Sequence, residues 1–183
     1  MEPRIIVTTP SLPQRTTFRN ECVESVWQQS LQPVAHLVYL DYAYQGPARV
    51  LNAMLPSISA SNAEWVAQLA DDDLMLPHHL RVLADNAKDA DIVYSYCRVE
   101  GRAWDPNAAF DADRLRRENY IPATTLIRTS LCEELGWRAD AAHGFEDWDF
   151  WLRALDCGAV FKCVPEVTWV YRFHGKNLSY QTG

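Results

Sequence analysis

The sequence predicts a single α/β domain with a mixed, mainly parallel central sheet and helices on its faces. Two observations support this prediction. Apolar runs of strand length alternate with segments of helical periodicity along most of the chain, which is the order found in layered α/β domains. The chain has 183 residues, of which 48% are hydrophobic and 22% charged, so one domain can bury a substantial core.

Four strands are expected in the first half of the chain, and the first three lead into helices. Their apolar runs cover 4–9, 36–41, 64–69 and 91–96. Pro47 suits the first turn of the second helix, and Pro77 begins the third. In open α/β sheets, ligands bind beyond the carboxyl ends of the strands. The loops that carry Ser11 and Asp41 should therefore share one crevice with the aspartates that follow the third strand.

Further elements are expected in the second half. The pattern predicts a strand within 120–128 followed by a short helix, an aromatic-rich helix at 146–155, and a last strand at 167–173. No repeat, low-complexity tract or linker interrupts the chain. We therefore expect residues 1–183 to form one domain.

The composition disfavours several functions. The formal net charge of −7 argues against general nucleic-acid binding, because phosphate backbones attract basic surfaces. No apolar run approaches the roughly 20 residues that span a bilayer, and the N-terminus has no cleavable signal pattern, so we expect a cytoplasmic protein without a membrane anchor. The five cysteines lack a CxxC pair, which indicates free thiols rather than a zinc site.

Three adjacent aspartates, Asp71, Asp72 and Asp73, follow the apolar run at 64–69. Unpaired neighbouring carboxylates repel one another, and a divalent cation removes that penalty. Carboxylate oxygens suit Mg²⁺ or Mn²⁺, and such ions also bind substrate phosphates. The alternative is a solvated acidic turn that caps the next helix, since acidic residues favour that position.

The segment from Leu69 to Pro77, with the sequence LADDDLMLP, resembles the DxD region of family-2 glycosyltransferases with the GT-A fold. In that family an apolar strand ends in a Leu-Asp-x-Asp-Asp-like run, and a proline opens the next helix. The first aspartate of the pattern falls on Ala70 here. Asp72 takes the second aspartate position, which implies metal binding, and Asp71 or Asp73 must supply what Ala70 cannot.

The resemblance covers nearly the whole chain. The segment 10–15 (PSLPQR) resembles the family's first loop, which contacts the nucleoside, and Asp41 stands where the family places an aspartate that reads the base. Gly144–Arg153 (GFEDWDFWLR) resembles the family's Glu-Asp-Trp-Asp-Leu-Trp-Leu-Arg segment. The closing run 171–179 (YRFHGKNLS) resembles the family's Tyr-Arg-x-His…Asn-x-Ser ending. The arginine that the family carries before Asn52 is absent here.

This resemblance implies an inverting, single-displacement glycosyltransferase that moves a sugar from a nucleotide-diphosphate sugar to an acceptor hydroxyl. It implies Mn²⁺ or Mg²⁺ as cofactor. The residues implied as metal ligands are Asp72, Asp73 and His174. The residues implied as donor contacts are Pro10, Ser11, Arg15, Asp41 and Asp71. Because a carboxylate at position 41 can accept a hydrogen bond from a ring N–H such as that of uracil, a UDP-sugar is the favoured donor.

The acidic pair Glu146-Asp147 carries the predicted base. Asp147 is our choice to deprotonate the acceptor, and Glu146 orients the acceptor or the base; the reverse assignment stays open. Without the family, these carboxylates would simply cap the aromatic helix. Residues 1–97 are then the nucleotide-sugar and metal-binding half, and 98–183 the acceptor and catalytic-base half.

Three other readings compete with the enzyme. A catalytically inactive sugar-nucleotide binding module is the first, supported by Ala70 and the missing arginine, but pure binding does not need the Glu146-Asp147 pair. A scaffold that kept only the fold is the second. A nucleotidyltransferase is the third, but a Gly-rich basic loop for a triphosphate does not follow the first strand. The sequence leaves the acceptor open, and it also allows a homo-oligomer.

Overall fold

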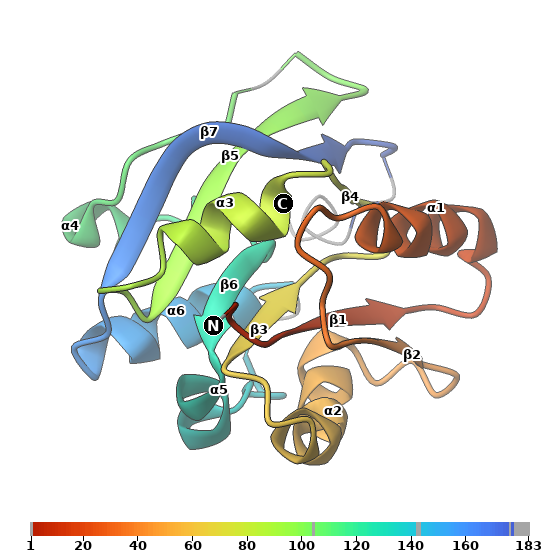
Figure 1. Ribbon diagram of the computed structural model, residues 1–183, viewed down its shortest axis with the longest axis horizontal. Coiled ribbons are helices and arrows are strands. Elements are labelled where there is room, and N and C mark those ends of the chain that lie inside the picture. The colour runs from red at the N-terminus through yellow and green to blue at the C-terminus, as the bar shows by residue number, and fades with distance from the viewer. Residues whose placement is uncertain (1, 104, 142–143, 176, 178–183) are drawn as a thin grey trace.

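The computed structural model describes residues 2–103, 105–141, 144–175 and 177, which form one twisted sheet between two layers of helices (Figure 1). The described chain forms seven strands and six helices. The strands are β1 (Ile5–Ser11), β2 (Ala35–Leu40), β3 (Trp65–Gln68), β4 (Leu74–Met75), β5 (Ile92–Glu100), β6 (Thr125–Arg128) and β7 (Phe161–Arg172). The helices are α1 (Thr16–Trp27), α2 (Pro47–Ala60), α3 (His79–Asp85), α4 (Ala112–Leu115), α5 (Thr129–Leu135) and α6 (Glu146–Asp156).

The sheet is mixed, as predicted. Its strand order is β2-β1-β3-β6-β5-β7-β4. The pairs β1–β2, β1–β3 and β5–β7 are parallel, whereas β3–β6, β5–β6 and β4–β7 are antiparallel. The parallel strands β1, β2 and β3 therefore have their carboxyl ends at the same edge of the sheet, which is where ligands bind in open α/β sheets.

Both faces of the sheet are covered by apolar helix faces. On one face α2, α5 and α6 pack over Ile6, Val66 and Ile127. On the other face α1 and α3 pack over Ile5, Val7 and Ala67 (Figure 1). Alternate residues of β1 thus point into opposite cores, which is the period-2 pattern of a strand buried on both sides.

Pro47 begins α2, as predicted, and Asn52 on the same helix ties it to the loop before α6. The Asn52 amide nitrogen donates to the carbonyl of Trp137 at 2.6 Å, and the backbone nitrogen of Trp137 donates back to Asn52 Oδ1 at 2.9 Å. Trp137 is buried and stacks on Phe150 of α6, with ring centroids 5.1 Å apart. The Asn52 side chain therefore holds α2 against the backbone of Trp137, which lines the cavity described below.

Strand β7 is longer than the predicted 167–173. It starts at Phe161 and runs beside β5, and its register shifts where Ser95 pairs with Val164 but Tyr96 with Val167. Pro165 and Glu166 fall in this irregularity. Proline cannot donate a ladder hydrogen bond, so a bulge is where a strand tolerates it. The predicted strand therefore began after this irregularity and missed the part of β7 that precedes it.

Two elements were not predicted, β4 and α4. Strand β4 has two residues and is defined by its antiparallel pairing with Val170 and Trp169 of β7. Helix α4 has four residues and begins where Asp111 Oδ1 accepts a hydrogen bond from the backbone nitrogen of Arg114. Both are too short to carry a periodic signal.

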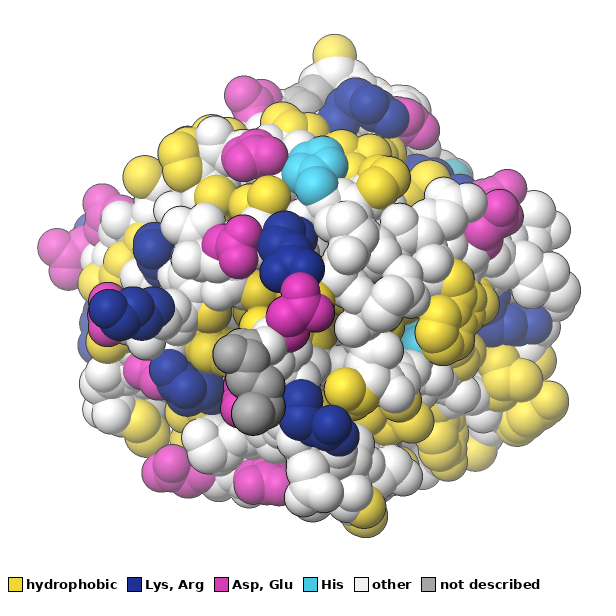
Figure 2. Space-filling view, viewed as in Figure 1, with side chains coloured by type: hydrophobic (Ala, Val, Ile, Leu, Met, Phe, Trp, Pro, Cys, Tyr) yellow, Lys and Arg dark blue, Asp and Glu magenta, His cyan; other side chains and the backbone are white. Residues whose placement is uncertain are grey.

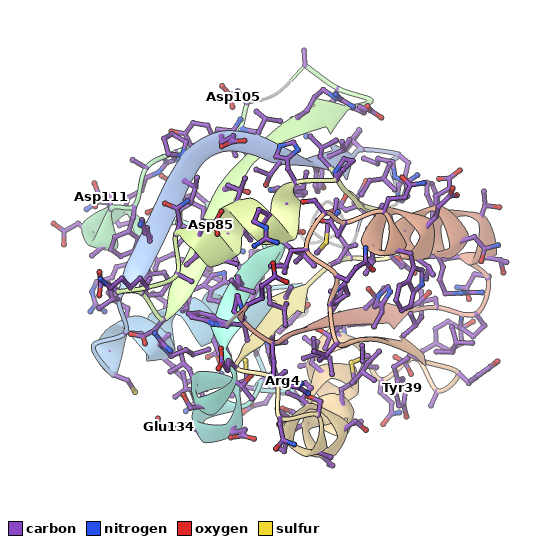
Figure 3. All side chains as sticks on the ribbon, viewed as in Figure 1. Arg4, Tyr39, Asp85, Asp105, Asp111 and Glu134 are labelled. Atoms are coloured by element: carbon purple, nitrogen blue, oxygen red, sulfur yellow. The ribbon has the colours of Figure 1, made fainter. Side chains whose placement is uncertain are left out.

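The surface carries charges of both signs, interspersed over the face shown in Figure 2. Tyr39 points outward from the edge strand β2 (Figure 3). Among the described residues, helices fall short of the length and apolarity that a bilayer span requires. The five cysteines are free, with Cys157 exposed and Cys22, Cys97 and Cys132 buried.

Candidate functional site

A cavity of about 610 Å³ lies beyond the carboxyl ends of β1, β2 and β3 and extends to the start of α6. Its walls bring together the Ser11 and Asp41 loops and the triplet, as predicted, with other predicted site residues, whereas His174 does not line it. The predicted residues that line the cavity are Pro10, Ser11, Arg15, Asp41, Asp71, Asp72, Asp73, Glu146 and Asp147. The second half of the chain closes the cavity through the loop after β5, which includes Asp105 at the edge of the view in Figure 3.

The loop after β1 holds the first aspartate of the triplet. Ser11 Oγ donates to Asp71 Oδ2 at 2.7 Å, and Arg15 Nη1 donates to Asp71 Oδ1 at 2.7 Å. Arg19, one turn into α1, donates to Ser11 Oγ and to the carbonyl of Leu12. Asp71 is thus fixed from the β1 side, and the hydroxyl of Ser11 is already in use as its donor.

Asp72 contacts residues that are far apart in the sequence, from the loop after β1 and from the segment after β7. Its Oδ2 lies 3.0 Å from Arg15 Nη1, 3.0 Å from His174 Nε2 and 3.5 Å from Asn177 Nδ2. Asn177 also accepts from the backbone nitrogen of His174, which closes the turn after β7. His174 stacks on Phe18 of α1, with ring centroids 4.8 Å apart. The imidazole therefore has a fixed orientation towards Asp72.

Asp73 has a different environment. Its Oδ1 accepts a hydrogen bond from the backbone nitrogen of Arg172 at 3.0 Å, which joins the triplet to β7. Burial, and then the charge of Asp72, raise the pKa of Asp73 well above its ordinary value. The Arg172 guanidinium lies over Phe18 and donates to Glu21, so it clamps α1 onto the end of β7.

A divalent cation fits part of this donor set. Asp72 Oδ2 and His174 Nε2 converge, and a carboxylate oxygen with an imidazole nitrogen suits Mn²⁺ or Mg²⁺ when phosphate oxygens and water complete the shell. Within the described ranges there is no group of three His, Cys, Asp or Glu side chains arranged to hold a metal ion. Among the described residues, Asp72 and His174 are thus two converging ligands, and Asp73 Oδ1 is directed to the backbone of Arg172.

Asp41 also lines the cavity, just after β2. Its Oδ2 accepts from the backbone nitrogen of Gly46 at 2.9 Å, and Oδ1 is buried without a hydrogen-bond partner. A buried carboxylate oxygen without a donor is costly. Asp41 is therefore ready to accept from a ligand N–H or O–H in the cavity.

Asp147 is the second residue of α6, is half-buried, and accepts hydrogen bonds from neutral donors. Its Oδ1 accepts from Asn119 Nδ2 at 3.0 Å and from the backbone nitrogen of Trp148 at 2.7 Å. Burial, and then the neighbouring charge of Glu146, raise the pKa of Asp147 from 3.8 to about 7. A carboxyl group with a pKa near neutrality is suited to general acid–base work.

Sequence reasoning did not identify Asn119 or Asn177 as site residues. Asn119 lies between α4 and β6, 28 residues before Asp147, and asparagine there reads as an ordinary loop residue. Asn177 stands in the closing run that resembles the family, which was a usable signal. Residues 178–179 of that run lie outside the described residues.

Sequence comparison finds a glycosyltransferase relative. No protein-family model matches the chain. The chain is 26% identical over 196 residues to the protein named Uncharacterized glycosyltransferase YwdF from Bacillus subtilis (strain 168). The alignment covers 89% of this chain and 73% of the relative.

Solved structures show the same fold. Residues 1–349 of TarS from S. aureus, in complex with UDP-GlcNAc, match with a TM-score of 0.77 and 14% identity over 96% of this chain. The mannosyltransferase PcManGT from Pyrobaculum calidifontis, in complex with GDP-Man and Mn²⁺, matches with a TM-score of 0.67 and 13% identity over 97% of this chain. This chain spans 60% and 59% of those two structures.

These similarities agree with the architecture and with the position of the cavity. The solved structures, at 13–14% sequence identity, show only that the fold is shared. The relative at 26% identity shows a similarity in sequence as well. The resemblance found in the motifs is therefore confirmed: this chain has the GT-A fold of glycosyltransferases and resembles them in sequence.

Proposed function

We propose that this protein is a metal-dependent, inverting glycosyltransferase that moves a sugar from a nucleotide-diphosphate sugar to an acceptor hydroxyl. One observation carries the proposal. One cavity is lined at one side by Asp72, whose Oδ2 lies 3.0 Å from His174 Nε2, and at another side by the half-buried carboxyl of Asp147, whose pKa is raised to about 7. Stabilisation of a leaving diphosphate and removal of an acceptor proton need those two kinds of group.

The nucleoside end of the donor is assigned to the loops after β1 and β2. Pro10 and Ser11 line the cavity there, and Asp41 offers its unpartnered Oδ1 as an acceptor. Uracil carries a ring N–H that can donate to this oxygen. The similar structures of TarS and PcManGT are complexes with UDP-GlcNAc and GDP-Man, and both ligands are nucleotide-diphosphate sugars. We favour a UDP-sugar for this chain.

The diphosphate is assigned to the triplet edge of the cavity. Asp72 and His174 would hold Mn²⁺ or Mg²⁺, and when bound the ion would act as a Lewis acid on the leaving diphosphate. Asp73 supports the site from the backbone of Arg172, and Asp71 from Ser11. The proposed metal pair joins the half 1–97 to the half 98–183, so the donor site draws on both.

Asp147 is proposed as the general base. Its Oδ1 is held by Asn119 and by the backbone of Trp148, which leaves the second oxygen for the acceptor hydroxyl. Glu146 also lines the cavity and is the neighbour whose charge contributes to the raised pKa of Asp147. One base suffices for a single displacement, which inverts the anomeric centre.

A panel of nucleotide sugars tests this proposal. UDP-, TDP-, GDP- and CDP-sugars are each added with Mn²⁺, with Mg²⁺ or with EDTA, and thermal unfolding and donor hydrolysis are measured. We expect a UDP-sugar with Mn²⁺ to raise the unfolding midpoint most, because ligands that bind the native state stabilise it. Slow hydrolysis of the same donor should accompany it, and NMR of the first-formed sugar should show the inverted anomer.

The panel also separates the alternatives. Donor-dependent stabilisation without hydrolysis, and without transfer to any of a set of sugar acceptors, would point to the inactive binding module. A GDP- or CDP-sugar that stabilises far more than any uridine or thymidine donor would overturn the base assignment. Retention of the anomeric configuration would overturn the single-displacement mechanism.

A further inference from the structure

Arg15 neutralises two members of the acidic triplet at once. Its Nη1 lies 2.7 Å from Asp71 Oδ1 and 3.0 Å from Asp72 Oδ2, so one guanidinium nitrogen serves both carboxylates. Those two side chains expose only 4% and 9% of their surface. Buried neighbouring carboxylates need a counter-charge, and Arg15 supplies one.

The oxygen that faces His174 is already fully engaged. Arg15, His174 and Asn177 all lie within hydrogen-bonding range of Asp72 Oδ2. A carboxylate oxygen offers about two lone-pair sites. A divalent cation can therefore bind this oxygen only if one of the present neighbours withdraws.

A cation bound by both Asp72 Oδ2 and His174 Nε2 would replace their mutual hydrogen bond, so charge decides which further neighbour withdraws, and it selects Arg15. His174 is itself the partner ligand in the proposed metal pair. Asn177 is the most distant of the three, at 3.5 Å, and its amide nitrogen is also held by the carbonyl of Arg172 at 2.9 Å. A guanidinium and a divalent cation on the same oxygen would repel each other, so the two exclude one another.

The cavity gives the released arginine a destination. Arg15 lies in the turn between β1 and α1, lines the cavity, and has a side chain that is 22% exposed. A diphosphate in that cavity presents oxygens that match the planar fork of a guanidinium.

We propose that Arg15 is an exchangeable counter-ion, which neutralises Asp71 and Asp72 in the free protein and passes to the donor diphosphate when a divalent cation takes its place. The proposal rests on the proposed function and adds a coupling to it. Cation and nucleotide each bind weakly alone, and each strengthens the other by the same factor, as linkage requires.

The test measures Mn²⁺ binding rather than turnover. Free Mn²⁺ is followed by electron paramagnetic resonance with the full chain, without and with UDP, for the wild type, Arg15→Gln and Arg81→Gln. Arg81 is the matched control, because it is an arginine on α3 paired with Glu2 at the surface. Without UDP, Arg15→Gln should bind Mn²⁺ about tenfold more tightly than the wild type, within the usual range of site-to-site coupling.

UDP should then strengthen Mn²⁺ binding in the wild type and in Arg81→Gln, but much less in Arg15→Gln. The single variant leaves two buried carboxylates without their arginine, so its fold is checked by circular dichroism. The double variant Arg15→Gln/Asp71→Asn removes one positive and one negative charge and keeps the summed charge of the cluster. It should fold and should also bind Mn²⁺ more tightly than the wild type without UDP.

Unchanged or weaker Mn²⁺ binding in the double variant without UDP would overturn the exchange, even where the wild type binds Mn²⁺ and UDP together. That result leaves the proposed function standing. The wild type failing to bind UDP with any divalent cation would overturn the proposed function and the exchange together.

Discussion

The cavity is lined by two carboxylates, the buried Asp72 and the half-buried Asp147, whose hydrogen-bond partners differ in charge. Asp72 meets the guanidinium of Arg15, the imidazole of His174 and the amide of Asn177. Asp147 meets the amide of Asn119 and a backbone nitrogen, with Glu146 beside it.

This contrast shows how one residue type can serve two purposes. A carboxylate among cationic partners is prepared to hold a cation or to exchange one for another. A carboxylate that burial has shifted to a pKa of about 7, and that neutral donors orient, is prepared to accept and release a proton near neutral pH. These surroundings are our reason for proposing a binding role for Asp72 and a proton-transfer role for Asp147.

The largest expected effect follows from removing the base. Asp147→Asn keeps the shape of the side chain and removes the proton acceptor, so transfer or donor hydrolysis should fall by about 10²–10⁴-fold. UDP affinity should stay near that of the wild type, because a base acts in the transition state. Steady-state kinetics and calorimetry measure the two quantities.

Glu146→Gln is the comparison for this variant. Near wild-type turnover of Asp147→Asn together with a dead Glu146→Gln would move the base by one residue. Normal turnover in both variants would mean that the base lies elsewhere.

The next effect concerns the binding carboxylate. Asp72→Ala should remove the gain in UDP affinity that Mn²⁺ provides, a loss of about 10²-fold or more, because even residues that only orient metal ligands cost about 10–100-fold. Calorimetry of UDP with and without Mn²⁺ measures this gain. Asp85→Ala, at an exposed position of α3, is the control and should keep the gain. Equal UDP affinity in Asp72→Ala and the wild type with Mn²⁺ would remove Asp72 from the metal site.

Substitutions of Asp147 and of Asp72 should change the free energy of unfolding in opposite directions. The pKa of Asp147 is raised in the folded protein to about 7 from 3.8, so the native state holds the proton more tightly than the unfolded state does. Stability is then lost as pH rises from about 4 to about 7, at about 1.4 kcal/mol per pKa unit. Asp147→Asn should therefore stabilise the fold at pH 8 by ~1–4 kcal/mol, and this gain should vanish below about pH 4.

Asp72→Asn should act in the opposite direction, because it leaves Arg15 and His174 with a weaker partner. Urea unfolding at pH 4 and at pH 8 measures both variants. If Asp147→Asn destabilises the fold at pH 8 as much as Asp72→Asn does, the proposed contrast between the sites does not hold.

The smallest effect is a shift of the pH profile. In the wild type, turnover should fall about tenfold per pH unit below a pH near 7, as Asp147 takes up its proton. The hydrogen bond from Asn119 lowers the pKa of Asp147, so Asn119→Ala should move this acid limb upward by less than about one pH unit. Asn86→Ala, on the far end of α3, should leave the limb in place. A limb that does not move in Asn119→Ala would show that Asn119 does not act on the base.

The sequence predicted the crevice well because its residues follow strands. Ser11, Asp41 and the triplet each stand at the carboxyl end of an apolar run, and parallel pairing of β1 with β2 and β3 brings those ends together. The start of α6 was equally visible, since the acidic pair precedes an aromatic run with helical spacing. The local sequence pattern is sufficient to predict a site residue where the sheet topology alone determines its position.

Side-chain partners were less visible because they depend on contacts between distant segments. Asp73 was predicted as a metal ligand, and nothing in the triplet itself indicated that the backbone of Arg172, 99 residues later, would bind it. Likewise, the contact of Arg15 with Asp71 spans 56 residues. Strand β4 exists through its pairing with β7, so its two residues carry no signal of their own.

The contact between Asp72 and His174 joins residues 102 positions apart, and it lies at the end of β7, the last strand of the chain described here. Domains generally fold as units, and both apolar cores of the sheet join residues of β1 and β3 with residues of β5 and β6. The Asp72–His174 contact therefore forms only when the segment after β7 has packed against the strands made first, so a chain that stops before β7 lacks it.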